Sequence, residues 1–208
     1  MDARFDLLFD ITFYVSRPLW VTRLIAFSIS RFTSLALGIG PQNMNYDEWA
    51  KTVPQEITSD SLWKMKAYQL ALFAVEIGWQ DVLKLASDRR MLWLSDQLYR
   101  SLGSVSANLA KGYSRGTSKE RAHFYEYTLG SGRESRDWYY KSRHTLGEAV
   151  AFHRIQLMTQ IIRLLLSMVP QQRGYNIHEP AAEYAAGSAD SMFADILQNV
   201  PFAKENET

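Results

Sequence analysis

Apolar residues recur at helical spacing along four stretches of the chain after residue 57. In the second stretch they advance by four, four, three and four residues, which places them on one stripe of an α-helix: Leu94, Leu98, Leu102, Val105 and Leu109. The same periodicity predicts helices over Ser61–Ala86, Asp88–Lys111, Ser118–Val150 and Phe152–Val169. No competing pattern of alternating apolar and polar residues predicts a β-strand.

Glycine, serine and proline residues mark the expected ends of these helices. Gly112 is suited to the left-handed turn that stops a helix, and Ser118 is a suitable cap for the next one. Pro170 is expected to end the last helix. Four apolar-striped helices with short connections predict an all-α fold, an antiparallel up-down-up-down four-helix bundle over residues 58–170.

A polar row runs beside the apolar stripe of the second predicted helix. Its members are Gln97, Arg100, Ser104, Asn108 and Lys111. A buried Arg or Asn needs hydrogen-bond partners. Two interpretations follow for the first four of these side chains and Glu134: they satisfy one another across the second and third helices, or they line a buried polar site.

This polar row belongs to a longer motif. Its positions in the second helix are Gln97, Leu98, Arg100, Ser104, Val105, Asn108, Leu109, Ala110 and Gly112, followed by Arg115, Ser118, Phe124, Gly130, Ser131 and Glu134. In order and spacing the motif resembles that of the four-helix-bundle proteins encoded in intervening sequences of 23S ribosomal RNA genes. The resemblance covers about Ser61–Val169, and Lys111 stands where the family pattern usually has Glu.

The resemblance implies a bacterial, cytoplasmic protein that assembles into a homo-oligomeric ring, often a pentamer. A related branch of the family serves as the accessory protein of diversity-generating retroelements. RNA or DNA and a reverse transcriptase are therefore implied partners. For the matching polar, glycine and aromatic positions, the resemblance implies structural rather than catalytic roles.

Composition limits the possible chemistry. The chain has 208 residues, of which 47% are hydrophobic and 22% charged, as in an ordinary globular protein. It contains no cysteine, so disulfides, thiolate metal sites and cysteine nucleophiles are excluded, which fits a reducing cytoplasm.

The N-terminal extension, residues 1–57, is apolar in part. Its stretch Leu19–Leu37 is interrupted by Arg23 and Arg31, whereas a membrane-spanning helix needs about 18 to 20 uninterrupted apolar residues. Three interpretations remain: a helical segment that packs on the bundle, an amphipathic element at a membrane surface, or sequence upstream of a true start at Met44. We expect the last, and no membrane partner.

The C-terminal residues 171–208 are polar, rich in alanine and acidic. They predict a mostly irregular tail with one short helix near Asp190–Val200. The acidic tail also offsets an excess of Lys and Arg between Asp96 and His144, so that the net charge of the whole chain is only +1.

Patterns for catalysis and metal binding are sparse. A di-iron bundle needs two Glu-x-x-His pairs and further Glu ligands, whereas Glu120 and His123 form one such pair alone. His144 and Glu148 lie one turn apart without further ligands. Phosphate-binding glycine motifs and a placed Ser-His-Asp triad are missing as well. We therefore predict no enzymatic activity, no metal site and no cofactor.

Basic and aromatic residues share one face of the third predicted helix. Spacings of three, four and three residues bring three guanidinium groups and a phenol together, an arrangement that suits phosphates and exposed bases. We predict nucleic-acid contacts by Arg115, Lys119, Arg133, Arg136, Tyr140 and Arg143. The alternative is a protein-interaction scaffold in which this face is only solvated and Trp138 and Tyr139 lie at a subunit interface.

Overall fold

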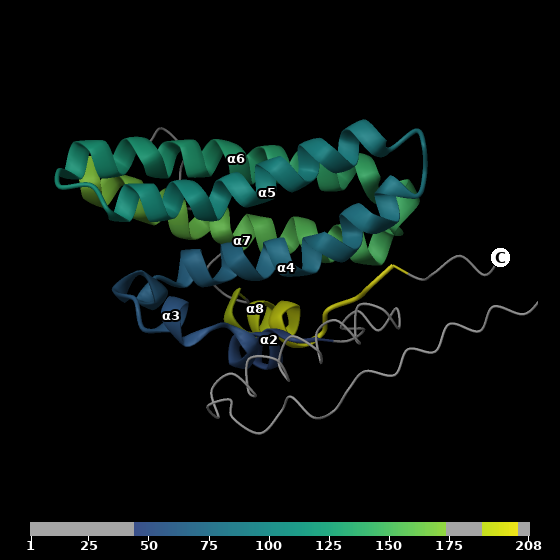
Figure 1. The fold of residues 1–208 in the computed structure, drawn as a ribbon, viewed down its shortest axis with the longest axis horizontal. Coiled ribbons are helices and arrows are strands. Elements are labelled where there is room, and N and C mark those ends of the chain that lie inside the picture. The colour runs from purple at the N-terminus through teal and green to yellow at the C-terminus, as the bar shows by residue number, and fades with distance from the viewer. Residues whose placement is uncertain (1–43, 174–188, 204–208) are drawn as a thin grey trace, which may run out of the picture. The chain divides into compact units, whose positions relative to one another are not determined.

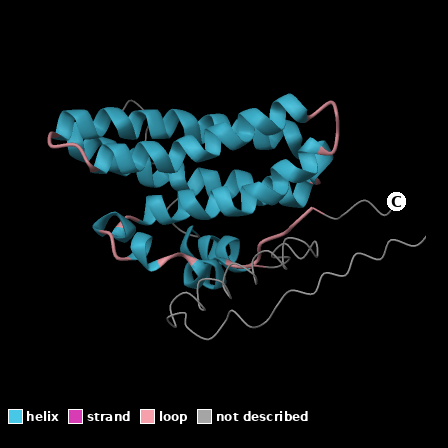
Figure 2. Ribbon diagram, in the orientation of Figure 1, coloured by secondary structure: helices cyan, strands magenta, loops and turns pink. Residues whose placement is uncertain are grey.

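A computed structural model describes residues 44–173 and 189–203 of the protein, and these residues are helical apart from short connections (Figure 2). The all-α class is thereby confirmed. The elements are α2 (Tyr46–Thr52), α3 (Gln55–Thr58), the 3₁₀ helix η2 (Ser61–Lys64), α4 (Lys66–Ala86), α5 (Leu92–Tyr113), α6 (Ser118–Leu146), α7 (Glu148–Arg173) and α8 (Ala189–Gln198). The apolar stretch Leu19–Leu37 and the proposed upstream segment lie outside the described residues.

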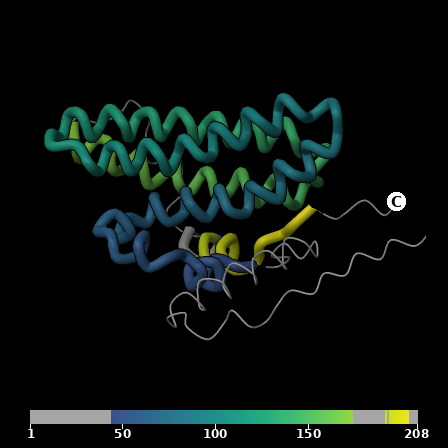
Figure 3. The backbone as a smooth tube through the Cα atoms, in the orientation of Figure 1, coloured from purple at the N-terminus to yellow at the C-terminus, as the bar shows by residue number. Residues whose placement is uncertain are grey.

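The four longest helices, α4 to α7, lie lengthwise beside one another (Figures 1 and 3). Helix α5 packs against α4 on one side and α6 on the other, and α7 packs against α6 and α4. The short helices α2 and α8 contact each other, and α8 also contacts α7. Within the described part of the chain, no helix is both long and apolar enough to cross a membrane.

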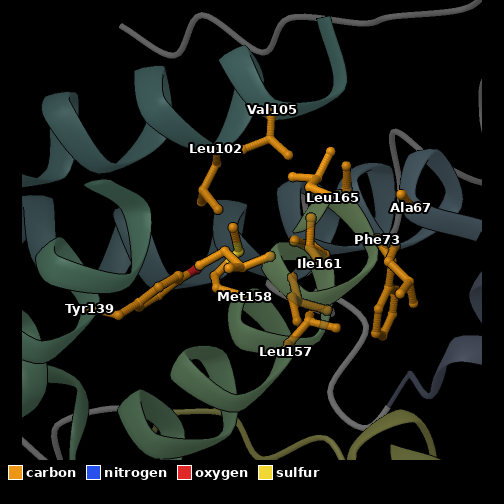
Figure 4. Packing of buried hydrophobic residues seen from close by; sticks show 14 of the residues in the cluster. Ala67, Phe73, Leu102, Val105, Tyr139, Leu157, Met158, Ile161 and Leu165 are labelled. Carbon is orange, nitrogen blue, oxygen red and sulfur yellow. The ribbon is translucent and has the colours of Figure 1, made fainter. Parts of the chain in front are cut away.

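The core forms where the apolar stripes of these helices meet. The predicted stripe on α5 is buried along its whole length, from Leu94 to Leu109. Opposite it lie buried residues of α4 and α7, among them Phe73, Leu157 and Ile161 (Figure 4). This burial is the main stabilising contribution to the fold, since each fully buried Leu or Phe side chain is worth about 1.5 to 3 kcal/mol.

Several predicted helix ends are wrong. The third helix ends at Leu146 rather than Val150, because Gly147 adopts φ 89°, a left-handed conformation that glycine allows. Helix α7 begins at Glu148 and continues through Pro170 to Arg173. Pro170 does not end it at once: proline disrupts the bond to the preceding turn, and the helix ends three residues later.

The predicted role of Gly112 is also wrong. Helix α5 continues past it to Tyr113, and Gly112 is not in a left-handed conformation. A Cβ atom at this position would lie 2.7 Å from a ring carbon of Tyr125 on α6. Gly112 therefore allows the close approach of α5 and α6.

Two helix starts differ by a few residues from the prediction. Helix α5 begins at Leu92 rather than Asp88, because the Asp88 carboxylate accepts hydrogen bonds from the Arg90 backbone and guanidinium and forms a turn. The cap of α6 is Thr117 rather than Ser118: its hydroxyl accepts a hydrogen bond from the Glu120 backbone at 3.2 Å.

Both ends of the described chain add short helices to the core. The first predicted helix is divided into η2 and α4 at Met65, and α2 before it contributes buried Tyr46 and Trp49. The ring of Trp49 lies 5.2 Å from that of Phe73 on α4. The short helix predicted near Asp190–Val200 is confirmed as α8, of which Ile196 and Leu197 are buried.

Candidate functional site

Part of the polar motif row forms hydrogen bonds between α5 and α6. The hydroxyl oxygens of Ser104 and Ser131 lie 2.9 Å apart, and the Asn108 amide donates to Ser104 at 3.0 Å. One turn further along, the Ser135 hydroxyl donates to that of Ser101 at 2.9 Å. Ser101 and Ser135 were missed by the sequence analysis, although they lie three and four residues from the motif residues Ser104 and Ser131.

Other members of the row lie outside these hydrogen bonds. Arg100 is exposed and pairs with Asp96 on its own helix at 3.1 Å. Glu134 is also exposed and accepts a hydrogen bond from the Trp138 indole at 3.2 Å. Gln97 is half-buried, and Lys111 points to solvent. The motif row therefore forms a hydroxyl and amide contact between two helices rather than a buried polar site.

The glycine of α6 that allows close packing is Gly132 rather than the motif residue Gly130. Gly130 is exposed and has open space around it, whereas Gly132 is buried and would place a Cβ atom 3.4 Å from Ile162 of α7. The two residues lie on different faces of the helix because they are two positions apart.

The basic face of α6 lies along its border with α7. Arg133, Arg136 and Tyr140 line a shallow hollow of about 320 Å³, together with Asp137 and Ile155. Tyr140 is 56% exposed, so its ring is accessible to a partner. The structure thus brings together two of the predicted guanidinium groups and the predicted aromatic residue.

Arg143 extends this site by one turn of α6. Its guanidinium lies over the ring of Tyr140, 4.1 Å from the ring centre, and also donates to the Tyr140 carbonyl at 2.8 Å. Within the hollow, the Asp137 carboxylate pairs with Lys141 at 2.5 Å. Lys141 thus offsets the one negative charge that lines the hollow, and the hollow keeps a net positive charge.

Arg115 and Lys119 lie at the other end of α6. The Arg115 guanidinium lies over the ring of Phe124, 4.6 Å from the ring centre, and Lys119 is exposed. With about 1.5 Å per helical residue, Lys119 is roughly 21 Å from Arg133 along the helix axis. The six predicted contact residues therefore form two clusters rather than one.

Between these clusters, α6 presents an acidic residue that is paired. The carboxylate of Glu126 accepts a hydrogen bond from the Arg173 guanidinium at 2.5 Å and lies 3.9 Å from His123. The pair with Arg173 offsets the negative charge at the middle of the helix. Glu126 therefore adds no net negative charge to the border of α6 and α7 between the two basic clusters.

A second polar cluster lies inside the helical core and was not predicted. Asp81 of α4 and Arg154 of α7 are each 1% exposed, and Arg154 donates to the two carboxylate oxygens at 2.8 and 3.3 Å. The Tyr139 hydroxyl donates to the same carboxylate at 3.1 Å. The sequence signal for this cluster was the presence of one charged residue, Asp81 or Arg154, on each of two otherwise apolar helix faces.

The buried position of this cluster determines its acid–base properties. Burial, together with the neighbouring Asp81 carboxylate, raises the pKa of the Tyr139 hydroxyl well above its ordinary value. Burial, together with the Arg154 guanidinium, lowers the pKa of the adjacent His153 to about 4. Tyr139 thus stays protonated and His153 neutral near pH 7, and both are closed off from solvent. These properties fit a structural role better than proton transfer to a substrate.

The two predicted Glu and His pairs have other contacts or lie at the surface. Glu120 accepts a hydrogen bond from Thr117, and the His123 ring lies 4.4 Å from that of Tyr127. His144 and Glu148 are both exposed. In the ranges 44–173 and 189–203, no group of three His, Asp or Glu side chains is arranged to hold a metal ion.

Comparison with known proteins gives one match. A family model described as 23S rRNA-intervening sequence protein matches residues 63–168, just over half of the 208 residues. The matched range includes α4, α5 and α6 and most of α7, with all six predicted nucleic-acid contacts and the buried Asp81 and Arg154 pair. No curated protein and no solved structure matches the chain.

Proposed function

The chain belongs to the family of 23S rRNA-intervening sequence proteins, and on this premise we propose that it is a non-enzymatic, homo-oligomeric four-helix-bundle protein that binds nucleic acid. Its bundle would consist of α4 to α7 in antiparallel up-down-up-down order. The contacts between successive helices and the short connections between them support this arrangement. An accessory role beside a nucleic-acid enzyme such as a reverse transcriptase belongs to the same proposal.

The main support for nucleic-acid binding is the cationic hollow at the border of α6 and α7. Arg133 and Arg136 line it beside the exposed ring of Tyr140. Guanidinium groups form two-pronged hydrogen bonds to phosphate oxygens, and an aromatic ring stacks on an unpaired base. Arg143 lies over the ring of Tyr140 and provides a third positive charge one turn away.

A salt-dependent binding titration tests this proposal. The full chain is titrated against structured RNA, duplex DNA and hybrid duplex, with Arg133, Arg136 and Arg143 changed together to Ala in one variant. A control variant removes three charges elsewhere, by changing the exposed Lys51, Lys64 and Arg89 to Ala.

We expect the α6 variant to bind at least tenfold more weakly. The slope of log affinity against log salt should decrease in magnitude by about 0.9 for each lost phosphate contact. The control should bind nearly as the parent protein does. Absence of binding at low salt, or equal losses in the two variants, would contradict the proposal.

A protein-interaction scaffold without nucleic-acid binding is the second candidate. Exposed aromatic residues at the surface of α4, α5 and α6 favour it: the rings of Trp79 and Tyr99 lie 5.5 Å apart, and those of Trp93 and Trp138 lie 5.3 Å apart. Such side chains are enriched at protein interfaces. A protein that forms stable oligomers but binds none of the three nucleic acids would support this candidate.

A further inference from the structure

The C-terminal segment, residues 193–202, packs against helices that are far from it in the sequence. Ile196 and Leu197 of α8 are buried in the core, and Phe193, Val200 and Phe202 pack against it. At the surface, the Gln198 amide donates to the Asp47 carboxylate of α2 at 2.6 Å. These contacts define a docking groove, formed by α2 and α7, that is occupied by this segment.

Two buried side chains of α7 hold the backbone of the segment. Arg154 donates to the Pro201 carbonyl at 3.0 Å, and His153 lies 2.7 Å from the Ile196 carbonyl through its Nε2 atom. Arg154 also contacts the Nδ1 atom of His153 at 2.8 Å. Because a guanidinium can only donate, Nδ1 is the acceptor, and Nε2 carries the proton that is donated to Ile196.

The groove is therefore complementary to the C-terminal end of a helix. Ile196 lies in the last turn of α8, where backbone carbonyls lack partners within the helix. The aligned peptide dipoles also place partial negative charge at that end, where His153 donates to the Ile196 carbonyl. The Phe202 ring, 5.5 Å from the same guanidinium, completes the contact.

The buried polar cluster does not depend on the segment for its internal bonds. Arg154 donates twice to Asp81, and Tyr139 donates to the same carboxylate, all within α4, α6 and α7. Withdrawal of the segment would leave one donor on Arg154 and one on His153, which water can satisfy. Docking of the segment is thus separable from formation of the helical core.

We propose that the docking groove accepts the C-terminal segment of a second copy of the chain as well as its own. Every contact described above belongs to residues 193–202, and none requires that the segment come from the same chain. The intervening residues 174–188 number fifteen, and an extended chain of that length reaches at most about 50 Å. This exchange rests on the homo-oligomer proposed above, which would keep a second segment close to each groove.

Cross-linking of single-cysteine variants tests the exchange, because the natural chain has no cysteine. Asp47→Cys places a thiol at the groove, and Gln198→Cys places one on the segment. Both positions are exposed and lie next to each other when the segment is docked. The two variants are co-expressed with different tags and treated with a short bismaleimide. A covalent pair that carries both tags exceeds the chance level only when the segment of one chain occupies the groove of another.

Two further samples make the result decisive. The double variant, with both cysteines in one chain, reports docking itself, and failure to cross-link it would contradict the docked segment. Asp47→Cys co-expressed with Lys119→Cys, an exposed position on α6, measures cross-linking by chance. We expect the groove and segment pair to exceed this control at least tenfold.

Light scattering on the same samples separates the two proposals. Oligomers without the doubly tagged product would overturn the exchange and leave the homo-oligomer standing. Monomers without that product would overturn both. A doubly tagged product from oligomers, above the Lys119→Cys control, would support both.

Discussion

At the scale of single residues, the Asp81 and Arg154 pair connects three of the long helices. The carboxylate receives two hydrogen bonds from α7 and one from Tyr139 of α6. Removing two charges from water is costly, and such a pair is tolerated only when its geometry is good and its remaining hydrogen-bonding groups are satisfied. Here Arg154 uses its other donors on His153 and the Pro201 carbonyl. The pair therefore restricts how α4 and α7 can pack.

Breaking this pair should destabilise the protein strongly. Asp81→Ala leaves a buried guanidinium without its carboxylate, and we expect the free energy of unfolding to fall by about 3 to 5 kcal/mol. Urea denaturation followed by circular dichroism measures the change. As a control, Asp96→Ala removes an exposed carboxylate paired with Arg100 and should change stability by no more than about 0.5 kcal/mol. Similar small effects in both variants would show that the buried pair is not needed for stability.

His153 should make the stability of the protein depend on pH. Its pKa is lowered to about 4, by burial and by Arg154; Asp195 and the Ile196 carbonyl act in the opposite direction without cancelling the shift. The unfolded chain, with a His pKa near 6.5, binds more protons between these values. The contribution of neutral His153 to the free energy of unfolding is therefore fully present above about pH 6.5. It is lost as the pH falls toward 4, by about 3 kcal/mol in total.

Substitution of His153 tests this assignment. His153→Gln cannot be protonated, so its unfolding free energy should decrease between pH 7 and pH 5 by about 2 kcal/mol less than that of the parent protein. Equal pH profiles for the parent protein and His153→Gln would rule out the neutral, buried His153 described above.

At the scale of helices, the contact of α5 with α6 depends on a missing side chain. A Cβ atom on Gly112 would lie 2.7 and 2.9 Å from two ring carbons of Tyr125 and 3.0 Å from Cβ of Phe124. Tyr125 is buried and Phe124 is half-buried, so neither can move away freely. The two helices can approach this closely only with glycine at this position.

Gly112→Ala should therefore destabilise the protein although alanine favours helices. We expect a loss of about 1 to 3 kcal/mol in unfolding free energy from overpacking. Gly103→Ala is the matched control, because it lies on the same helix with no atom within 4 Å of its added Cβ. That variant should be neutral or more stable by up to about 1 kcal/mol. A stabilising Gly112→Ala would mean that α6 can shift to accept the methyl group.

Gly112 and Gly147 show where prediction from the sequence succeeds and fails. Periodicity located the four long helices because it reports burial of one face, which the sequence contains directly. It assigned a helix end to Gly112 and a helical interior to Gly147, whereas the structure has the reverse. The role of Gly112 depends on the ring of Tyr125, a tertiary contact that local spacing does not contain.

The candidate site was predictable to the same extent. Arg133, Arg136 and Tyr140 share one hollow because they lie on one helix at helical spacing. In contrast, Asp81 and Arg154 are 73 positions apart, and a single sequence gives no signal that pairs them. Likewise, Ile155 lines the hollow only because α7 packs beside α6.

At the scale of the whole molecule, the cationic hollow and the exposed tryptophans lie along different borders of the bundle. The hollow with Arg133, Arg136 and Tyr140 faces α7. On the other side, Trp138 contacts Trp93 of α5, and Trp79 of α4 contacts Tyr99. Trp93 is 65% exposed and Trp79 45%, which is unusual for side chains of this size. An oligomer that buries these aromatic residues would leave the cationic hollow free for nucleic acid.

The oligomeric state should therefore respond to the exposed tryptophans and not to other exposed aromatic residues. We expect Trp79→Ser with Trp93→Ser to reduce the mass measured by light scattering toward that of a monomer, because an aromatic side chain at an interface centre often contributes about 2 kcal/mol or more to binding. Phe152→Ser, at a 61% exposed residue of α7, is the matched control and should keep the parent mass. Both variants should unfold at the parent urea concentration, since they remove little buried surface from the subunit. A parent protein that is already monomeric, or a double variant of unchanged mass, would place the subunit interface elsewhere or remove it from the proposed function.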